Sequence, residues 1–84
     1  MTENLTNKII AWAAETGSCA AEQPSRQERE SYLAERRREL VAGAVAEGAT
    51  EADAAALSDA CVSAARRIMT ELLAQRAGVP KGRA

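Results

Sequence analysis

Ser25-Arg26-Gln27-Glu28 and Thr50-Glu51-Ala52-Asp53 are the two stretches that decide how this chain folds. Each places a hydroxyl residue three positions before a carboxylate, and each precedes a long run of apolar residues at helical spacing. In such a capping box the hydroxyl accepts a hydrogen bond from a backbone N–H of the first turn. Gly48 and Gly78 follow the two runs, as glycines that end helices do. The pattern predicts two long helices joined by a short turn.

Three helices follow from the apolar spacing. The two capped runs predict helices over about residues 26–47 and 51–76. Upstream, Leu5, Ile9 and Trp12 recur at i, i+4 and i+7, which predicts a shorter helix over about residues 3–16.

The remaining segments contain helix-breaking residues. Gly17 is expected to end the first helix, and residues 17–24, which include Pro24, are expected to form a linker. Residues 1–78 then make a single helical domain, and residues 79–84 make a disordered tail.

Pairing the two long helices across Gly48 leaves part of the last helix uncovered. Leu40 should face Leu57, and Leu33 should face about Ala64. Beyond that point the last helix faces only the charged residues 26–30, so the first helix must cover it. We predict an all-α fold of three helices, dominated by a long antiparallel hairpin, with the last helix at its centre.

Composition limits what such a chain can do. It has 84 residues, and alanine supplies about half of its 46% hydrophobic content, so its own core is small. A net charge of −1 provides no general attraction to nucleic acid or to an anionic membrane. The acidic, polar N-terminus and the lack of a long apolar run predict a cytoplasmic protein without a membrane span. An excess of arginine over lysine suggests a bacterial source.

The side chains that most enzymes need are missing. The chain has no histidine, so it lacks the commonest general base and metal ligand, and it has no glycine-rich phosphate loop. Cys19 and Cys61 are too far apart for a zinc site, and Cys61 lies on the predicted core stripe. A disulfide between them could join the linker to the last helix, but a cytoplasmic chain favours free thiols. We expect a protein that is not an enzyme and that uses no cofactor or metal.

The two long helices and the short turn between them also suggest a DNA-binding helix-turn-helix. The helix that would enter the major groove begins with residues 50–56, which offer two acids and small apolar groups. Readers of the major groove need arginine, lysine, asparagine or glutamine there, so nucleic acid is an unfavoured partner.

Protein binding is the function that remains. The last helix carries a second apolar stripe beside its core stripe, which either belongs to the core under the first helix or stays open to a partner. Arg37 projects into the apolar arc of the middle helix. The Arg37 stem could cover the core with its head in water, or its guanidinium could reach a carboxylate on a partner. The expected partner-contact residues are the aromatic, arginine and second-stripe side chains Trp12, Tyr32, Arg37, Val62, Met69 and Leu73.

The hairpin over residues 25–78, the near-neutral charge and the lack of catalytic residues resemble the small all-helical antiactivators of bacterial conjugative elements, the TraM or QseM kind. The resemblance implies a mobile-element protein that binds a transcriptional activator and blocks it, without contacting DNA. We therefore expect a small regulatory protein acting by protein–protein binding. The alternative is a structural homodimer forming a four-helix bundle, or a subunit of a larger assembly.

Overall fold

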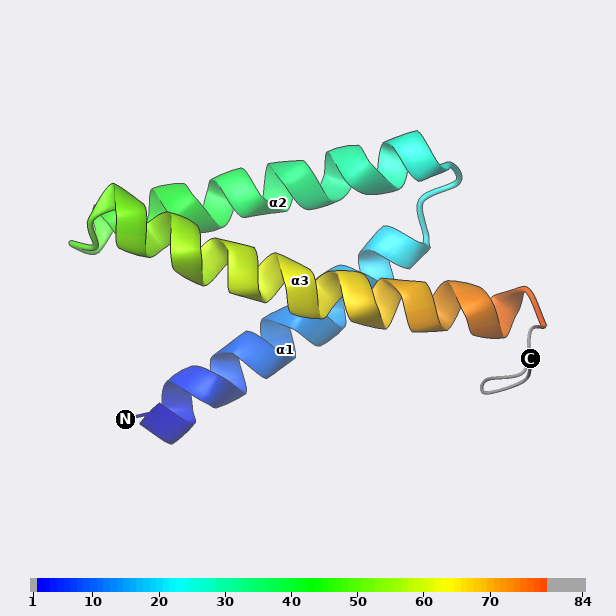
Figure 1. Ribbon diagram of the computed structural model, residues 1–84, viewed down its shortest axis with the longest axis horizontal. Coiled ribbons are helices and arrows are strands. Elements are labelled where there is room, and N and C mark those ends of the chain that lie inside the picture. The colour runs from blue at the N-terminus through cyan, green and yellow to red at the C-terminus, as the bar shows by residue number, and fades with distance from the viewer. Residues whose placement is uncertain (1, 79–84) are drawn as a thin grey trace.

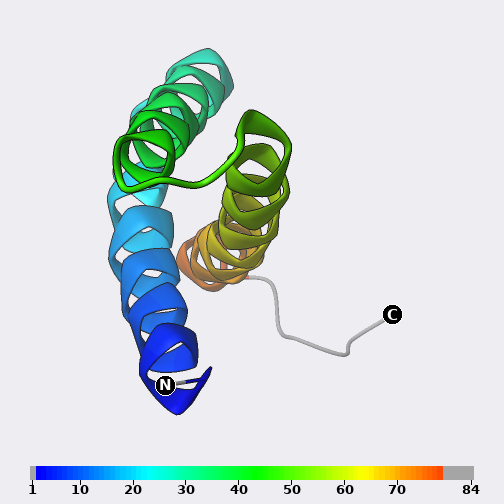
Figure 2. The same ribbon diagram turned by 90° about the vertical axis from the view of Figure 1, so that its left-hand side faces the viewer.

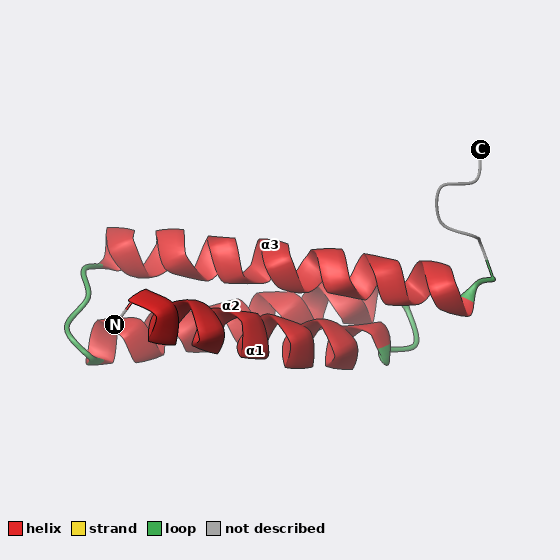
Figure 3. Ribbon diagram, turned by 90° about the horizontal axis from the view of Figure 1, so that it is seen from below, coloured by secondary structure: helices red, strands yellow, loops and turns green. Residues whose placement is uncertain are grey.

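The computed structural model describes residues 2–78, with side chains from Thr6 onward, and these residues form three helices. The helices are α1 (Thr2–Ala21), α2 (Arg26–Ala46) and α3 (Glu51–Arg76). Figures 2 and 3 show α1 and α2 in one layer and α3 in the other. The prediction of an all-α fold with three helices is confirmed. The predicted disorder of residues 79–84 concerns residues outside the described part of the chain.

Both predicted N-caps are present. The Ser25 Oγ accepts a hydrogen bond from the Glu28 backbone N–H at 3.1 Å, and the Thr50 Oγ1 accepts one from the Asp53 N–H at 3.1 Å. The Ser25 hydroxyl also donates to the Glu28 carboxylate at 3.0 Å. Each cap therefore satisfies an N–H that the first helical turn leaves without an intrahelical partner, which fixes where α2 and α3 begin.

Both predicted glycine stops are also present. Gly48 and Gly78 have φ values of 108° and 76°, a region that a side chain disfavours. After α2, the Gly48 N–H donates to the Val45 carbonyl and the Ala49 N–H donates to the Ala44 carbonyl, each at 3.0 Å. These two bonds form a Schellman motif, which turns the chain within a few residues so that α3 starts beside α2 (Figure 1).

The predicted end of the first helix was wrong. Gly17 lies inside α1, which continues to Ala21, so the connection to α2 is only residues 22–25. A Cβ at Gly17 would lie 2.5 Å from the Ala65 carbonyl oxygen and 2.9 Å from the Ile68 Cβ. At Gly17, α1 therefore approaches α3 closely, and the missing side chain permits that approach. Figure 1 shows the two helices crossing.

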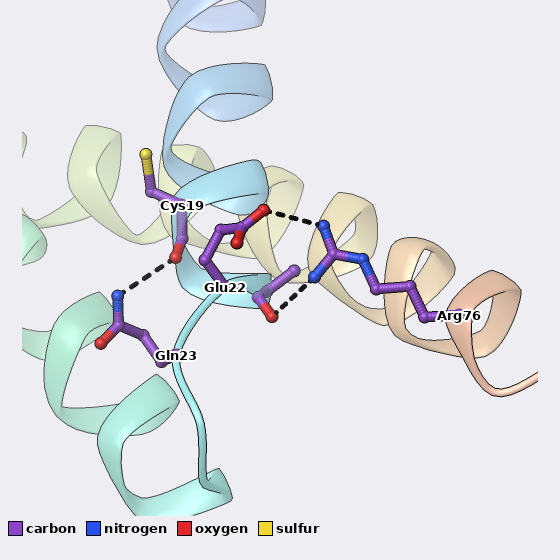
Figure 4. Close-up of polar contacts among 5 residues, drawn as sticks. Cys19, Glu22, Gln23 and Arg76 are labelled. Atoms are coloured by element: carbon purple, nitrogen blue, oxygen red, sulfur yellow. Dashed lines mark hydrogen bonds and ion pairs between the residues drawn. The ribbon is translucent and has the colours of Figure 1, made fainter.

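The last turn of α1 is held by side chains from outside it (Figure 4). Arg76, at the end of α3, donates to the Ala21 carbonyl and to the Glu22 carboxylate, both at 3.0 Å. Gln23 donates from its side-chain amide to the Cys19 carbonyl at 3.3 Å. Arg76 supplies a donor to the Ala21 carbonyl, one of the last carbonyls of α1, and this bond supports the four helical residues beyond Gly17.

The core is built mainly from small residues. It combines α1, α2 and α3 side chains that are at most 5% exposed: Ala13, Ala20, Ala21, Leu33, Ala65 and Met69. Ile68 and Leu72 pack against this cluster, as predicted for the part of α3 that faces only charged residues of α2. The most extensive contact of α3 is with α1, so the dominance of an α2–α3 hairpin stays a prediction.

Two ion pairs join α2 to α3. The Arg37 Nε donates to the Asp59 Oδ1 at 2.7 Å, and the Arg66 guanidinium donates to both carboxylate oxygens of Glu30 at 2.5 and 2.8 Å. In antiparallel helices, residues that lie opposite each other have residue numbers with a constant sum, which defines the register. That sum is 96 for both ion pairs. For the predicted opposite residues Leu40 and Leu57 the sum is 97, so the ion pairs agree with the expected register to within one residue.

Candidate binding surface

Trp12 and Tyr32 lie at the seam between α1 and α2, and both are half-buried. The Arg36 guanidinium lies over the Trp12 ring, with its carbon 5.9 Å from the ring centroid, which is cation–π distance. Tyr32 precedes Arg36 by one helical turn and hydrogen-bonds the Cys19 side chain of α1. Burial, and then this bond, raise the pKa of the Tyr32 hydroxyl. We call Trp12, Tyr32 and Arg36 the aromatic seam.

Arg36 keeps unused bonding capacity in this seam. Its Nη1 donates to Glu39 at 2.6 Å, while its Nε is buried and has no hydrogen-bond partner among the described residues. Its side chain is 33% exposed. Arg37, the predicted contact, lies next to Arg36 in the same arginine run, and the i, i+4 spacing of Tyr32 and Arg36 is the sequence signal that points to Arg36 instead.

Arg37, the predicted arginine contact, faces α3 instead. The sequence left open whether the Arg37 guanidinium reaches a carboxylate on a partner. In the structure it donates to Asp59, a carboxylate of the same chain. The side chain is still 38% exposed, so a partner could contact it.

The predicted strip of Val62, Met69 and Leu73 is not an open face. Met69 is 5% exposed and belongs to the core, while Val62 and Leu73 are half-buried and pack against it. Ala20 and Ala21, in the part of α1 beyond Gly17, belong to the same buried cluster as Met69. A partner could reach Met69 only if α1 moved away.

An open apolar groove lies on another side of α2. It has a volume of about 570 Å³ and an apolar floor with arginines at one end and an acid at the other; its lining residues are Arg37, Arg38, Val41, Ala42, Val45, Ala46 and Glu51. We call it the α2 groove. Val41 and Val45 follow the apolar helical spacing that is also typical of core residues, so the spacing alone could not separate this groove from the core.

Apolar side chains are also exposed on the other two helices. Ile10 on α1 is 60% exposed and Leu57 on α3 is 37% exposed, close to the 39% of Val45 in the α2 groove. Exposed apolar side chains that are scattered singly are ordinary, so Ile10 and Leu57 do not mark a site.

Cys19 and Cys61 are free thiols in the structure. Burial raises the pKa of the Cys61 thiol, which is 3% exposed and behaves as a small core residue. Among the described side chains, no group of three histidine, cysteine, aspartate or glutamate residues could hold a metal ion.

Thr16 and Ser58 are buried hydroxyls without a hydrogen-bond partner in the described region, and each is 1% exposed.

No family model, curated protein or solved structure matches this chain. Within residues 2–78, no helix is both long and apolar enough to cross a membrane. The candidate surfaces are therefore judged by their own chemistry.

Proposed function

We propose that this protein is a small regulator that acts by binding another protein through the aromatic seam. The observation that supports the proposal is the position of the only two aromatic residues in the chain. Trp12 and Tyr32 both lie outside the fully buried core, which is made mainly of alanines. A chain so short of large apolar side chains would gain stability by burying them, so their partial exposure favours a role in binding.

The chemistry of the seam fits a protein partner. Tryptophan, tyrosine and arginine are the residue types that most often dominate binding energy at protein interfaces. The Arg36 side chain is 33% exposed, so the exposed part of its guanidinium can donate to a carboxylate of a partner. The partner surface that fits best is an apolar pocket with an acidic rim.

The sharpest version of the proposal is antiactivation. In this version the protein binds a bacterial transcriptional activator and covers its DNA-binding or activating surface, so that transcription stops without contact between this chain and DNA. The resemblance to antiactivators of conjugative elements supports this version, as does the net charge of −1, which provides no attraction to the phosphate backbone.

The test is affinity capture from the native host with three forms of the full chain. Wild type should retain one protein in a stoichiometric complex. Arg36→Glu should weaken capture at least about tenfold, the size expected for a hot-spot residue. Arg67→Glu, the same charge change at an exposed position of α3, should capture as wild type does.

The captured protein is then purified and titrated onto its own promoter DNA in a mobility-shift assay. Antiactivation predicts that wild type releases the DNA and that Arg36→Glu does not. If no stoichiometric partner is captured, or if Arg36→Glu and Arg67→Glu behave alike, the seam is not the binding surface.

A further inference from the structure

The α2 groove faces away from the aromatic seam. Arg36 and Val45 are nine residues apart on α2, which is two and a half turns, so they point to opposite sides of the helix. The same spacing separates Tyr32 from Val41. A molecule seated in the groove would therefore leave the seam free.

We propose that the α2 groove is the interface of a symmetric homodimer, in which the α2 helices of two copies pack antiparallel. The groove is self-complementary in charge. Arg38 stands at its N-terminal end and Glu51 at its C-terminal end, with the apolar floor between them. A twofold axis reverses the direction of one copy, so the basic end of each copy meets the acidic end of the other.

The spacing along α2 supports this pairing. If Val41 of one copy lies opposite Val45 of the second, the twofold axis passes level with position 43. Arg38 then comes opposite position 48, which is in the turn that leads to Glu51. The alanines of the floor, Ala42 and Ala46, are small enough to let the two helix backbones approach closely.

The second copy is favoured over a foreign helix because the groove requires a particular occupant. That occupant must be apolar and small in the middle, acidic where Arg38 lies and basic where Glu51 lies. The groove of a second copy, with Arg38 from α2 and Glu51 from the start of α3, carries this pattern in reverse. With a net charge of −1 per chain, two copies repel each other only weakly. One helix face per copy is small against the roughly 1,200–2,000 Å² of a standard interface, so the dimer should be weak.

Sedimentation velocity of the purified full chain over a rising concentration series tests the proposal. Wild type should shift from monomer to dimer as concentration rises. Val45→Asp should remain monomeric throughout, whereas Ile10→Asp, the same kind of change at a more exposed apolar position of α1, should dimerise as wild type does. Circular dichroism of each variant shows that it is folded.

A charge-exchange experiment tests the twofold geometry itself. Arg38→Glu alone and Glu51→Arg alone should each remain monomeric, because every cross-copy contact then joins like charges. An equimolar mixture of the two variants should dimerise, because one contact then joins Arg38 to Glu51 and the other joins the two exchanged charges.

Several results would overturn the proposal: a monomer at every concentration, a dimer that survives Val45→Asp, loss of the dimer in Ile10→Asp, or a mixture that stays monomeric. A monomeric chain whose groove binds another protein instead would also overturn it. None of these results bears on the proposed function, since partner capture depends on Arg36 on the other side of α2.

Discussion

The close crossing of α1 over α3 makes a paired prediction about two glycines. Gly17 lies at the crossing, where an added Cβ would meet the Ala65 carbonyl oxygen at 2.5 Å and the Ile68 Cβ at 2.9 Å. Gly43 lies in α2, where an added Cβ has nothing within 4 Å. Changing each glycine to alanine therefore makes the same chemical change inside a helix, once in a crowded place and once in an open one.

The two substitutions should change the free energy of unfolding in opposite directions. Alanine in place of glycine inside a helix stabilises by about 1 kcal/mol, and this gain applies at both sites. At Gly17 the extra methyl group overpacks against a backbone oxygen that cannot rotate away, which costs about 2–3 kcal/mol, the upper part of the usual range. Gly43→Ala should therefore be about 1 kcal/mol more stable than wild type, and Gly17→Ala about 1–2 kcal/mol less stable.

Thermal unfolding followed by circular dichroism measures the difference. A change of 1 kcal/mol moves the Tm of a domain of this size by roughly 4–8 °C, so the two variants should differ by roughly 10–20 °C. The reasoning is refuted if Gly17→Ala is as stable as Gly43→Ala, because α1 would then not approach α3 closely at that residue.

Three further predictions concern buried and paired polar groups. Ser58→Ala should raise the free energy of unfolding by about 1 kcal/mol in urea titration, because its buried hydroxyl has no partner among the described residues; a loss of stability would show that the hydroxyl has a partner. The Arg66 hydrogen bond lowers the pKa of Glu30, so the pair stabilises the fold above the unfolded pKa and loses that effect as pH falls through the folded value. Arg66→Gln should cost less than about 1 kcal/mol at pH 7, as expected for an exposed pair, and the cost should fade in acid; a cost that is independent of pH contradicts this account. Because burial raises the pKa of the Cys61 thiol, it should stay protonated to higher pH and react with a disulfide reagent far more slowly than half-buried Cys19 in peptide mass mapping, and equal rates would contradict its burial.

The sequence was sufficient where local chemistry decides the structure. Ser25, Thr50, Gly48 and Gly78 act within one helical turn of themselves, so their caps and stops could be predicted from spacing alone. The need for α1 to cover the end of α3 could also be predicted, because it followed from the mismatch between apolar and charged stretches of neighbouring helices.

The sequence was insufficient where a distant segment decides the structure. Gly17 resembles a helix stop, and only the proximity of Ala65 shows that it is a crossing point. The continuation of α1 to Ala21 depends on Arg76, which is 55 positions away. The second apolar stripe allowed either burial under the first helix or an open contact strip, and the burial of Met69 in one cluster with Ala20 and Ala21 places that part of the stripe in the core.

The position of α1 on α3 determines which surfaces of this protein are open, and one nuclear Overhauser measurement tests it most directly. A methyl-resolved NOESY spectrum of the folded chain should show a strong cross-peak between the Gly17 α-protons and the γ2 methyl group of Ile68, because a Cβ placed at Gly17 would lie 3.0 Å from that carbon. Absence of this cross-peak, with random-coil shifts over residues 6–21, would contradict the fold and the aromatic seam between α1 and α2.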